Sequence, residues 1–413
     1  MVDRKIAYFS MEIGIDKDMP TYSGGLGILA GDTLKACGDV QVPIVGVTLL
    51  NRKGYFYQKL DEEGNQIEEE NNWSIDDFME LMEPVVDVEI EGRQVKVRAW
   101  RYEYEGIGDF KVPIYFLDVD MPENSDWDRR LTDLLYPGDY WYRLCQEIVL
   151  GIGGVRMLEA LGYQSISKYH MNEGHAAFLT FELLQKHMDN ENLQLQQALD
   201  IVREKCVFTT HTPVPAGHDK FPLEFAEKAL GGVLIDEISH LYMHGEEFNM
   251  TLLALNLSRY VNGVAQKHKE VSKKMFPGYQ IHSITNGVHS PTWVSSPFKN
   301  VFDKHIPSWR KDPFTLRNAL RISKDEIWGA HQKAKRDLLI EVNRETNVGF
   351  DKDFFTIGFA RRMTEYKRAE LLFNDIERLK DIANRQGPIQ ISVAGKAHRN
   401  DTKGKQIIRD LIN

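Results

Sequence analysis

A glycine-rich turn between a predicted strand and a predicted helix constrains the fold of this chain more than any other stretch. The turn is Thr21-Tyr-Ser-Gly-Gly-Leu-Gly-Ile-Leu-Ala-Gly-Asp32, and a buried strand is predicted before it at 5–11. The apolar residues after the turn recur on one helix face, at Leu26, Ala30, Leu34 and Cys37. This helix ends at Gly38, and the next strand is predicted at 42–50. The order strand, turn, helix, strand predicts one unit of a parallel α/β sheet.

The paired glycines Gly24 and Gly25 also indicate what the turn binds. Glycine lets a ligand approach the backbone closely, and the free N–H groups and positive dipole end of a helix N-terminus favour an anion such as phosphate. The alternative is a tight turn that only packs the helix against the sheet. A single glycine motif does not decide between these interpretations, so both stay open on the pattern alone.

Composition narrows the class of protein. The chain has 413 residues, of which 42% are hydrophobic, so we expect a soluble globular protein with two domains. Its formal charge of −10 provides no basic face for nucleic acid. No apolar run reaches the roughly 18 to 20 residues that a membrane span needs. The three cysteines, Cys37, Cys145 and Cys206, are odd in number and far apart, which predicts reduced thiols in a cytoplasmic protein.

The first 300 residues alternate predicted strands and helices around the opening unit. Antiparallel hairpins are predicted at 54–66 and 86–99, and a buried strand at 113–117. A helix predicted at 142–161 contains a Gly151-Ile-Gly-Gly154 segment, which indicates close packing against a neighbour. The remaining predicted segments are a strand near Tyr169, helices at 176–186 and 194–205, a strand at 206–210 and helical segments to about Lys274.

The organisation changes after Trp293. We expect 1–300 to form a Rossmann-like domain with hairpin insertions, 301–350 a helical connection, and 351–413 the start of a second Rossmann-like domain. The segments predicted in that second domain are a buried strand at 353–360, a helix at 368–382, a strand at 388–394 and a helix at 405–412. A doubly wound sheet normally has five or six strands, so the second domain is expected to be truncated.

Two histidine-containing segments follow predicted strands, where ligands bind in open α/β sheets. They are His170-Met-Asn-Glu-Gly-His175 and Thr209-Thr-His-Thr-Pro-Val-Pro-Ala-Gly-His-Asp219. We expect their histidines to hydrogen-bond substrate or backbone. Zinc ligation is the weaker alternative, because His170 lies at a strand end and its ring need not converge with that of His175.

A cationic segment follows the predicted strand of the second domain. Arg361, Arg362 and Lys367 lie where a helix is predicted to begin, and cations there oppose the helix dipole. An anion would offset that cost, and a guanidinium fork with an ammonium group suits phosphate. Two anion-favouring junctions, one in each domain, predict a phosphate held in the cleft between them.

Several motifs together resemble one family along the whole chain. The chain is similar to the glycogen (α-glucan) phosphorylases in their short bacterial form, which lacks the regulatory N-terminal extension. The motifs that carry the resemblance are Tyr8-Phe-Ser-Met-Glu12, the Gly24 turn, Gly54-Tyr-Phe-x-Gln58, Asn172-Glu-Gly-His-Ala-Ala-Phe178, Thr210-His-Thr-Pro-Val-Pro215, Val261-Asn-Gly-Val-Ala265, Asn286-Gly-Val-His289 and Arg362-x-x-Glu-Tyr-Lys-Arg368.

The resemblance implies a GT-B fold, in which two Rossmann-like domains face a cleft, and reversible phosphorolysis of α-1,4-glucan to glucose 1-phosphate. It also implies pyridoxal 5′-phosphate, whose phosphate acts as the acid. The residues implied to bind substrate are Gly24, Gly25, Leu26, His175, Asn286 and Tyr366. Those implied to be catalytic are Arg362, Lys367 and His211, and those near the cofactor are Arg361, Trp293 and Gly25. No metal is implied, and a homodimer is possible in the family.

One departure from the family limits these implications. The family's cofactor lysine lies in a Glu-Ala-Ser-Gly-Thr segment of the second domain that does not occur before Asn413. We therefore expect this polypeptide alone to be inactive and to hold no covalent cofactor. Two alternatives stay open: a nucleotide-sugar glucan synthase of the GT-B class, which would need a lysine where Ser23 stands, and a non-catalytic glucan-binding fragment with an exposed apolar flank.

Overall fold

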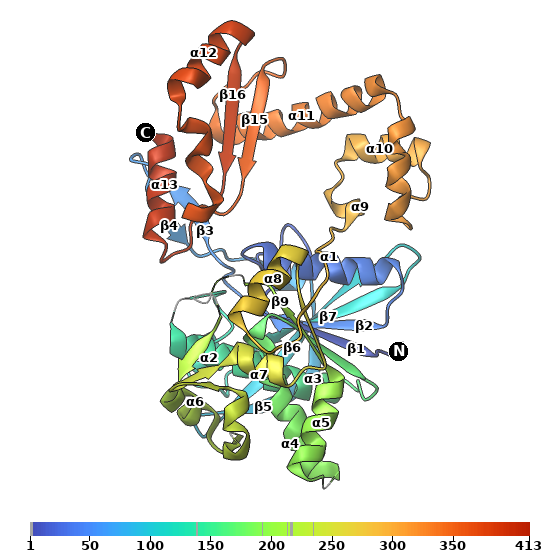
Figure 1. Ribbon diagram of the computed structural model, residues 1–413, viewed down its shortest axis with the longest axis vertical. Helices are drawn as coiled ribbons and strands as arrows, with labels where there is room; N and C mark the ends of the chain where they lie inside the picture. Colours follow the sequence, from blue (N-terminus) through green and yellow to red (C-terminus); the bar gives the residue numbers. More distant parts are fainter. Residues whose placement is uncertain (1–2, 138, 192, 213, 215–217, 234) are drawn as a thin grey trace. The chain divides into compact units, whose positions relative to one another are not determined.

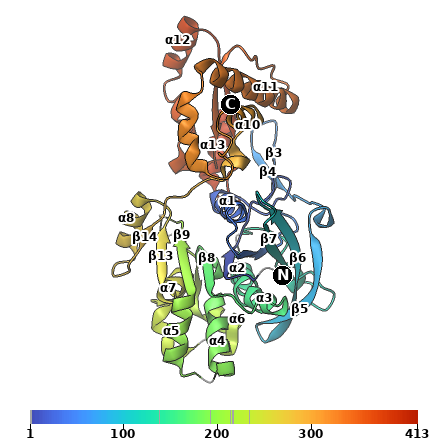
Figure 2. The same ribbon diagram turned by 90° about the vertical axis from the view of Figure 1, so that its right-hand side faces the viewer.

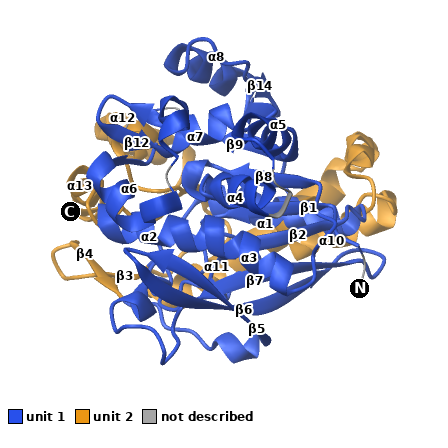
Figure 3. Cartoon of the chain, turned by 90° about the horizontal axis from the view of Figure 1, so that it is seen from below, with its two compact units in different colours: residues 1–55, 70–288 blue, residues 56–69, 289–413 orange. Residues whose placement is uncertain are grey.

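The structure is a computed structural model that describes residues 3–137, 139–191, 193–212, 214, 218–233 and 235–413 (Figure 1). Contacts divide the chain into two compact units (Figure 3). Unit 1 is Met1–Tyr55 with Glu70–Val288, and unit 2 is Phe56–Glu69 with His289–Asn413. Unit 2 thus contains a hairpin from the N-terminal part of the sequence, and the expected division at 300 and 350 stays a prediction.

The opening strand, turn, helix and strand of unit 1 form as predicted. β1 (Ile6–Ser10) and β2 (Ile44–Leu49) pair in parallel, and α1 (Gly25–Asp39) connects them. The helix lies close to the loop after β1, because a Cβ atom at Gly31 would stand 2.0 Å from the Gly14 carbonyl oxygen. A Cβ atom at Gly25, in contrast, would meet nothing within 4 Å. The turn therefore contains glycines of two kinds, one required by packing and one open.

The core of unit 1 is a nine-stranded sheet in the order β14-β13-β9-β8-β1-β2-β7-β6-β5 (Figure 2). Strands β14 through β7 pair in parallel, and β6 and β5 add an antiparallel edge. The unit is thus a mixed α/β fold with a mainly parallel sheet, as expected. The bounds of the added strands are β5 (Glu80–Ile90), β6 (Arg93–Glu105), β7 (Lys111–Asp118), β8 (Lys168–Asn172), β9 (Cys206–Thr210), β13 (Tyr260–Gly263) and β14 (His282–Ser283).

Helices cover both faces of this sheet. Tyr8 of β1 packs in the same apolar cluster as Leu34 of α1, whereas the ring of Phe9 faces Gly154 of α3. Neighbouring residues of a strand point to opposite faces, so α1 and α3 lie on opposite sides. The helices that follow α1 in unit 1 are α2 (Tyr140–Ile148), α3 (Gly154–Ala160), α4 (Leu179–Glu191), α5 (Leu195–Lys205), α6 (Leu223–Leu230), α7 (Met250–Asn256) and α8 (Gln266–Met275).

The glycines of the predicted helix 142–161 mark an irregular turn. Val149–Gly153 forms a π-helical turn between α2 and α3. A Cβ atom at Gly151 would stand 2.7 Å from the backbone nitrogen of Leu179, and one at Gly154 would stand 2.5 Å from the Phe9 ring. The predicted close packing is confirmed, but the continuous α-helix is not.

The expectation that 211–274 is helical is wrong in part. Residues 220–249 contain a small antiparallel sheet of β10 (Lys220–Pro222), β12 (Glu247–Asn249) and β11 (Met243–His244), and β13 joins the main sheet. These strands have two to four residues, which is too short for a periodic apolar pattern. These short strands can be recognised from the strands with which they pair, but not from their own sequence.

Unit 2 combines helices with two small sheets. The predicted hairpin forms from β3 (Tyr57–Leu60) and β4 (Gln66–Glu69), while β15 (Phe355–Ala360) and β16 (Ile389–Ala394) pair in parallel. The Gln66 amide joins the hairpin to the C-terminal segment, since its Nε2 donates to the Ala397 carbonyl (3.0 Å) and its Oε1 accepts from the Ala397 N–H (2.9 Å). The helices are α9 (Ser290–Trp293), α10 (Ser296–His305), α11 (Lys324–Thr346), α12 (Ile376–Gln386) and α13 (Thr402–Ile412).

Two expectations for unit 2 are wrong. β15 is not buried: Phe355 is 67% exposed, because β15 pairs with only one strand among the described residues. A continuous helix at 368–382 does not form either, since Arg368 has a φ of +52°, which a right-handed helix excludes. A short 3₁₀ segment (Ala369–Phe373) precedes α12 instead. No helix of the described residues is long and apolar enough to cross a membrane.

Candidate functional site

Four polar side chains form a row across the carboxyl end of the parallel sheet in unit 1. Ser10 of β1 is in register with Asn172 of β8, Asn172 with Thr209 of β9, and Thr209 with Asn262 of β13. Ligands bind at this edge in open α/β sheets. The two predicted histidine segments leave the sheet at this row, as expected from the positions of their strands.

A hydrogen-bond relay runs along this row from His211. The His211 Nε2 lies 2.6 Å from the Asn172 Oδ1, and the Asn172 Nδ2 donates to the Ser10 hydroxyl (3.1 Å). That hydroxyl donates to the Glu12 carbonyl (2.7 Å). Because the Asn172 Oδ1 can only accept, the His211 Nε2 carries the proton and its Nδ1 is an acceptor.

A second relay starts at His170. Its Nε2 lies 2.8 Å from the Thr209 hydroxyl, which donates to the Asn262 Oδ1 (3.0 Å). Burial lowers the pKa of both His170 and His211 to about 4. Both rings are therefore neutral near pH 7, so His211 can orient a hydroxyl group but is a poor proton donor at that pH.

Glu173 links the two histidine segments and has an unusual backbone. Its φ of +76° with ψ of 170° lies in a region that is almost restricted to glycine and costs about 1–3 kcal/mol. Its carboxylate accepts from the His211 N–H (2.8 Å) and the Thr212 hydroxyl (2.9 Å). Its own N–H donates to the Thr209 carbonyl (2.9 Å). These bonds hold a strained residue at the end of β8, which is typical of functional sites.

The glycine-rich turn already binds an anion from its own chain. The buried Glu12 carboxylate accepts from the Ser23 N–H (2.5 Å) and the Gly24 N–H (3.2 Å), and the Tyr136 hydroxyl donates to it (3.1 Å). Two N–H groups of the turn are therefore used by a carboxylate of the same chain, and binding of an external anion at the turn stays a prediction. Gly25 and Leu26 begin α1 beyond Glu12, at the helix end where N–H groups lack intrahelical partners.

His175 belongs to a separate charged cluster. Its Nε2 lies 3.2 Å from the Asp219 carboxylate, and Arg143 lies 3.4 Å from Asp219 and 3.6 Å from Glu147. Burial, together with Asp219, raises the pKa of Glu147 well above its usual value. Burial opposes ionisation of Asp219, yet Arg143 and His175 hold its pKa low. The cluster thus pairs one ionised carboxylate with Arg143.

The ligand atoms of Glu147, His175 and Asp219 lie within 4.8 Å of one another, as in a metal site. Arg143 supplies a cation at the same place. The zinc alternative that pairs His170 with His175 is not supported, because His170 contacts Thr209 whereas His175 contacts Asp219.

The cationic segment of unit 2 does not lie at a helix start, and its Arg361 and Arg362 are exposed whereas Lys367 is half-buried. Residues 361–364 are not helical, and Glu365–Lys367 forms a single 3₁₀ turn. The helix-dipole argument for an anion is therefore wrong. None of the three cations, Arg361, Arg362 and Lys367, makes an ion pair with a described residue. The Lys367 ammonium lies 4.6 Å from the centre of the Tyr366 ring, and Tyr366 is 73% exposed.

The other predicted site residues are placed by loops. Asn286 follows β14, and its N–H donates to the Val264 carbonyl (3.0 Å) beyond the end of β13. Asn286 is exposed, and it follows its strand at the same edge of the sheet as His211. Trp293 ends α9 in unit 2 and is 53% exposed. In the motif Thr210–Pro215, Pro213 and Pro215 lie outside the described residues.

Sequence reasoning assigned no role to several residues that the structure places here. Glu12, Asn172 and Glu173 stand inside the quoted motifs, whereas Tyr136 and Arg143 do not. The Arg143 guanidinium lies 4.2 Å from the centre of the Tyr136 ring. Nothing in the local sequence of α2 signals that the half-buried Arg143 and the buried Glu147 lie beside Asp219, the partner of His175, because these contacts depend on tertiary packing.

Comparisons with known proteins point in one direction. A family model described as carbohydrate phosphorylase matches residues 233–413. The chain is 39% identical to maltodextrin phosphorylase of Thermococcus litoralis over 99% of its length and 53% of that protein. It is 36% identical to glycogen phosphorylase of Mycobacterium tuberculosis (98% of this chain, 53% of that protein) and 34% identical to glycogen phosphorylase of Aquifex aeolicus (99% and 65%). The chain spans about half the length of the first of these relatives.

Proposed function

The chain belongs to the carbohydrate phosphorylase family, and on that premise we propose that it supplies part of an α-glucan phosphorylase. The reaction is the reversible phosphorolysis of α-1,4-glucan, such as glycogen or maltodextrin, to glucose 1-phosphate. The protein is then a glycosyltransferase of the GT-B class, and units 1 and 2 belong to its two Rossmann-like halves. A cytoplasmic location and a homodimer remain predictions of this proposal.

The observation that carries the proposal is the His211 relay at the carboxyl end of the sheet. Phosphorolysis requires a site that recognises sugar hydroxyl groups and holds a phosphate beside them. A neutral His211, whose Nε2 proton is committed to Asn172, offers its Nδ1 as an acceptor for a hydroxyl group. Asn286 and His175 at the same edge add donors and acceptors for the glucosyl unit.

We propose two separate groups of phosphate donors, one within each unit. In unit 1, Gly24 already donates to Glu12, so Gly25 and Leu26 would supply the free N–H groups at the start of α1. In unit 2, Arg362 and Lys367 would supply a guanidinium fork and an ammonium group, with Tyr366 beside them. Fixed donors of this kind stabilise the charge that develops as the glycosidic bond breaks, without having to reorganise.

Among the described residues, those that the family resemblance implies for the cofactor do not form a cradle for it. Arg361 and Trp293 of unit 2 are exposed, neither lines a described pocket, and Gly25 of unit 1 faces open space. The residues do not by themselves fit pyridoxal phosphate, so we derive no step through it. Cofactor binding stays a prediction for a polypeptide that includes the family's lysine segment.

The names of the relatives favour phosphorolysis over nucleotide-sugar synthesis. Ser23 precedes the glycines where the synthase alternative would need a lysine, and its N–H and hydroxyl face Glu12. A lysine side chain there would lie beside a carboxylate and not beside a pyrophosphate.

The test uses a polypeptide that joins this chain to the family's lysine segment, supplied with pyridoxal phosphate, maltodextrin and inorganic phosphate. We expect release of glucose 1-phosphate in a coupled assay, and loss of most of that activity in His211→Ala. His240→Ala, at an exposed histidine of the same unit, is the matched control and should keep activity. Extension of dextrin from ADP-glucose without phosphorolysis would contradict the proposal.

A further inference from the structure

Asparagine is followed directly by glycine at two places in the chain, Asn262–Gly263 and Asn286–Gly287. An asparagine side chain is reactive in this setting, because the backbone nitrogen of the next residue can attack its amide carbon. Glycine has no Cβ atom that would shield that nitrogen. Whether the attack takes place depends on how freely the two residues can move, and the structure places the two pairs in very different surroundings.

Asn262–Gly263 is held inside the main sheet of unit 1. Asn262 is 4% exposed, and its Oδ1 accepts from the Thr209 hydroxyl (3.0 Å). Gly263 ends β13, which pairs with β9 on one side and β14 on the other. A Cβ atom at Gly263 would stand 2.6 Å from the His268 Nδ1, so the backbone is tightly packed there. The side chain of Asn262 therefore cannot turn toward the next backbone nitrogen while the sheet is intact.

Asn286–Gly287 lies in an open segment that follows β14. Residues 284–288 have no regular secondary structure, and all of them are exposed. Neither the Asn286 side chain nor the Gly287 N–H makes a hydrogen bond with a described residue. A Cβ atom at Gly287 would meet nothing within 4 Å. Both reacting groups are therefore free of the contacts that hold Asn262 and Gly263.

We propose that Asn286 is a site of spontaneous deamidation through a cyclic imide with Gly287. The Gly287 backbone nitrogen loses its proton and attacks the Asn286 Cγ, the Cγ–Nδ2 bond breaks, and ammonia leaves. Water then opens the imide ring. Attack of water on Cγ gives aspartate, whereas attack on the main-chain carbonyl carbon of residue 286 gives isoaspartate, in which the backbone runs through the side chain. One water is consumed and one ammonia is released, and no oxidant or reductant takes part.

Either product changes a residue that is predicted to contact the glucosyl unit. The Asn286 amide both donates and accepts hydrogen bonds, whereas a carboxylate is ionised near pH 7 and only accepts. Isoaspartate also lengthens the main chain beside the Asn286 N–H, which donates to the Val264 carbonyl (3.0 Å). This consequence rests on the proposed function, but the deamidation does not. Asn286→Asp, which introduces the same charge, should weaken phosphorolysis by the polypeptide joined to the lysine segment.

The experiment incubates the purified 413-residue chain at mildly alkaline pH and follows its asparagines by peptide mass spectrometry. Enzymatic methylation detects isoaspartate. We expect Asn286 to be converted to aspartate and isoaspartate, and the rate to rise with pH because the attacking nitrogen must lose its proton. Gly287→Ala has room for its methyl group, which crowds that nitrogen and raises the barrier, so the variant should fold and react about tenfold more slowly.

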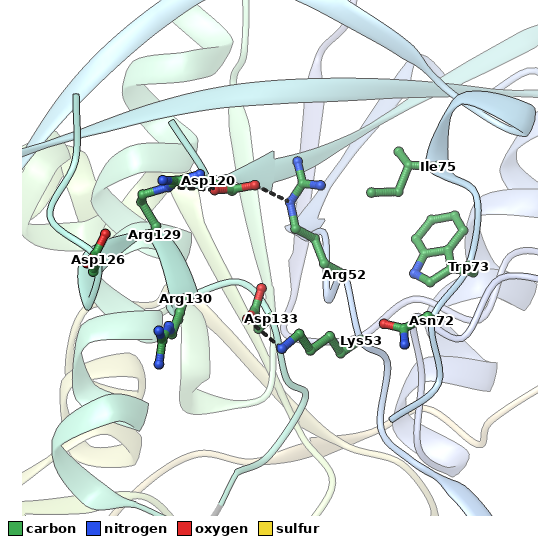
Figure 4. A pocket seen from close by; sticks show the side chains of 10 residues that line it. All are labelled: Arg52, Lys53, Asn72, Trp73, Ile75, Asp120, Asp126, Arg129, Arg130 and Asp133. Atoms are coloured by element: carbon green, nitrogen blue, oxygen red, sulfur yellow. Dashed lines mark hydrogen bonds and ion pairs between the residues drawn. The ribbon is translucent and has the colours of Figure 1, made fainter. Parts of the chain in front are cut away.

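Two other asparagines serve as internal controls, each lacking one requirement. Asn262 precedes a glycine but is buried. Asn72 is exposed and outside regular secondary structure but precedes Trp73, and both residues line the pocket shown in Figure 4. Both asparagines should keep their amides while Asn286 loses its own. In urea, where the sheet no longer protects it, Asn262 should react as fast as Asn286.

Any one of three results would overturn the inference. The first is that Asn286 keeps its amide in the folded chain. The second is that Asn262 or Asn72 reacts as fast as Asn286 under those conditions, since neither glycine nor freedom of movement would then decide the site. The third is that Gly287→Ala reacts as fast as the parent chain. Phosphorolysis is measured separately, so its absence would refute the proposed function and leave the deamidation result unaffected.

Discussion

The substitution Gly31→Ala should destabilise unit 1, although alanine is the better helix former. In an α-helix interior, alanine is favoured over glycine by about 1 kcal/mol. The new Cβ atom would stand 2.0 Å from the Gly14 carbonyl oxygen, so the loop after β1 must move by about 1 Å to restore an ordinary contact. Overpacking of this kind costs about 1–3 kcal/mol. The movement would also lengthen the bond from the Gly14 N–H to the Gly27 carbonyl (2.8 Å), which contributes about 1 kcal/mol.

These contributions leave a net loss of about 2 kcal/mol in the free energy of unfolding, close to a thirtyfold rise in the unfolded fraction. Urea unfolding followed by far-UV circular dichroism measures it, and hydrogen exchange of the peptide covering α1 locates it. The matched control is Gly25→Ala, because a Cβ atom there meets nothing within 4 Å and should change stability by less than about 0.5 kcal/mol. Equal stability of Gly31→Ala and the wild type would refute the assignment of Gly31 to packing.

Three further outcomes are expected. The free energy of unfolding should fall as the pH drops from about 6.5 to about 4. The reason is that His170 and His211 take up protons at a higher pH in the unfolded chain than in the fold, where their pKa is about 4. Equal midpoints of urea unfolding at pH 7.5 and pH 5 would argue against buried neutral rings. Asp118→Ala should lower the free energy of unfolding by about 3–5 kcal/mol, because it leaves Arg52 and Arg98 without their buried partner. The control Asp126→Ala breaks no ion pair among the described residues and should change the free energy of unfolding little. The purified chain incubated with pyridoxal phosphate should show no imine band that borohydride reduces specifically, and a stoichiometric band would show that one of its lysines holds the cofactor.

Sequence patterns predicted the elements of unit 1 that bury a long apolar face. β1, α1 and β2 occur where the glycine-rich turn and the apolar period placed them, and so does the hairpin of β5 and β6. Their side chains repeat often enough for the period to be recognised. β13 and β14 could not be found in this way, because four and two residues carry no period and their partners are distant in sequence.

The sequence predicted which segments contribute to the site, but not how their side chains are arranged in space. Motifs indicated His211 and the Gly24 turn, but the relay through Asn172 and Ser10 depends on the register between β1, β8 and β9. The same holds for Glu12, whose carboxylate fills part of the turn that was predicted to bind a ligand. The sequence alone does not show that a carboxylate of the same chain occupies part of the turn, because this depends on the direction in which the Glu12 side chain points.

During synthesis, the hairpin of β3 and β4 is made long before the residues with which it pairs. Gln66 bonds to Ala397, which the ribosome adds 331 residues later. At about 5–20 residues per second, the hairpin waits roughly 17 to 66 s for its partner. During that interval Tyr57, Leu60 and Ile67, which stay about half exposed even in the finished fold, have no unit 2 to pack against. A nascent chain must therefore carry an unpartnered β-ribbon while the whole sheet of unit 1 is made, and slower translation would lengthen its exposure to chaperones and to other chains.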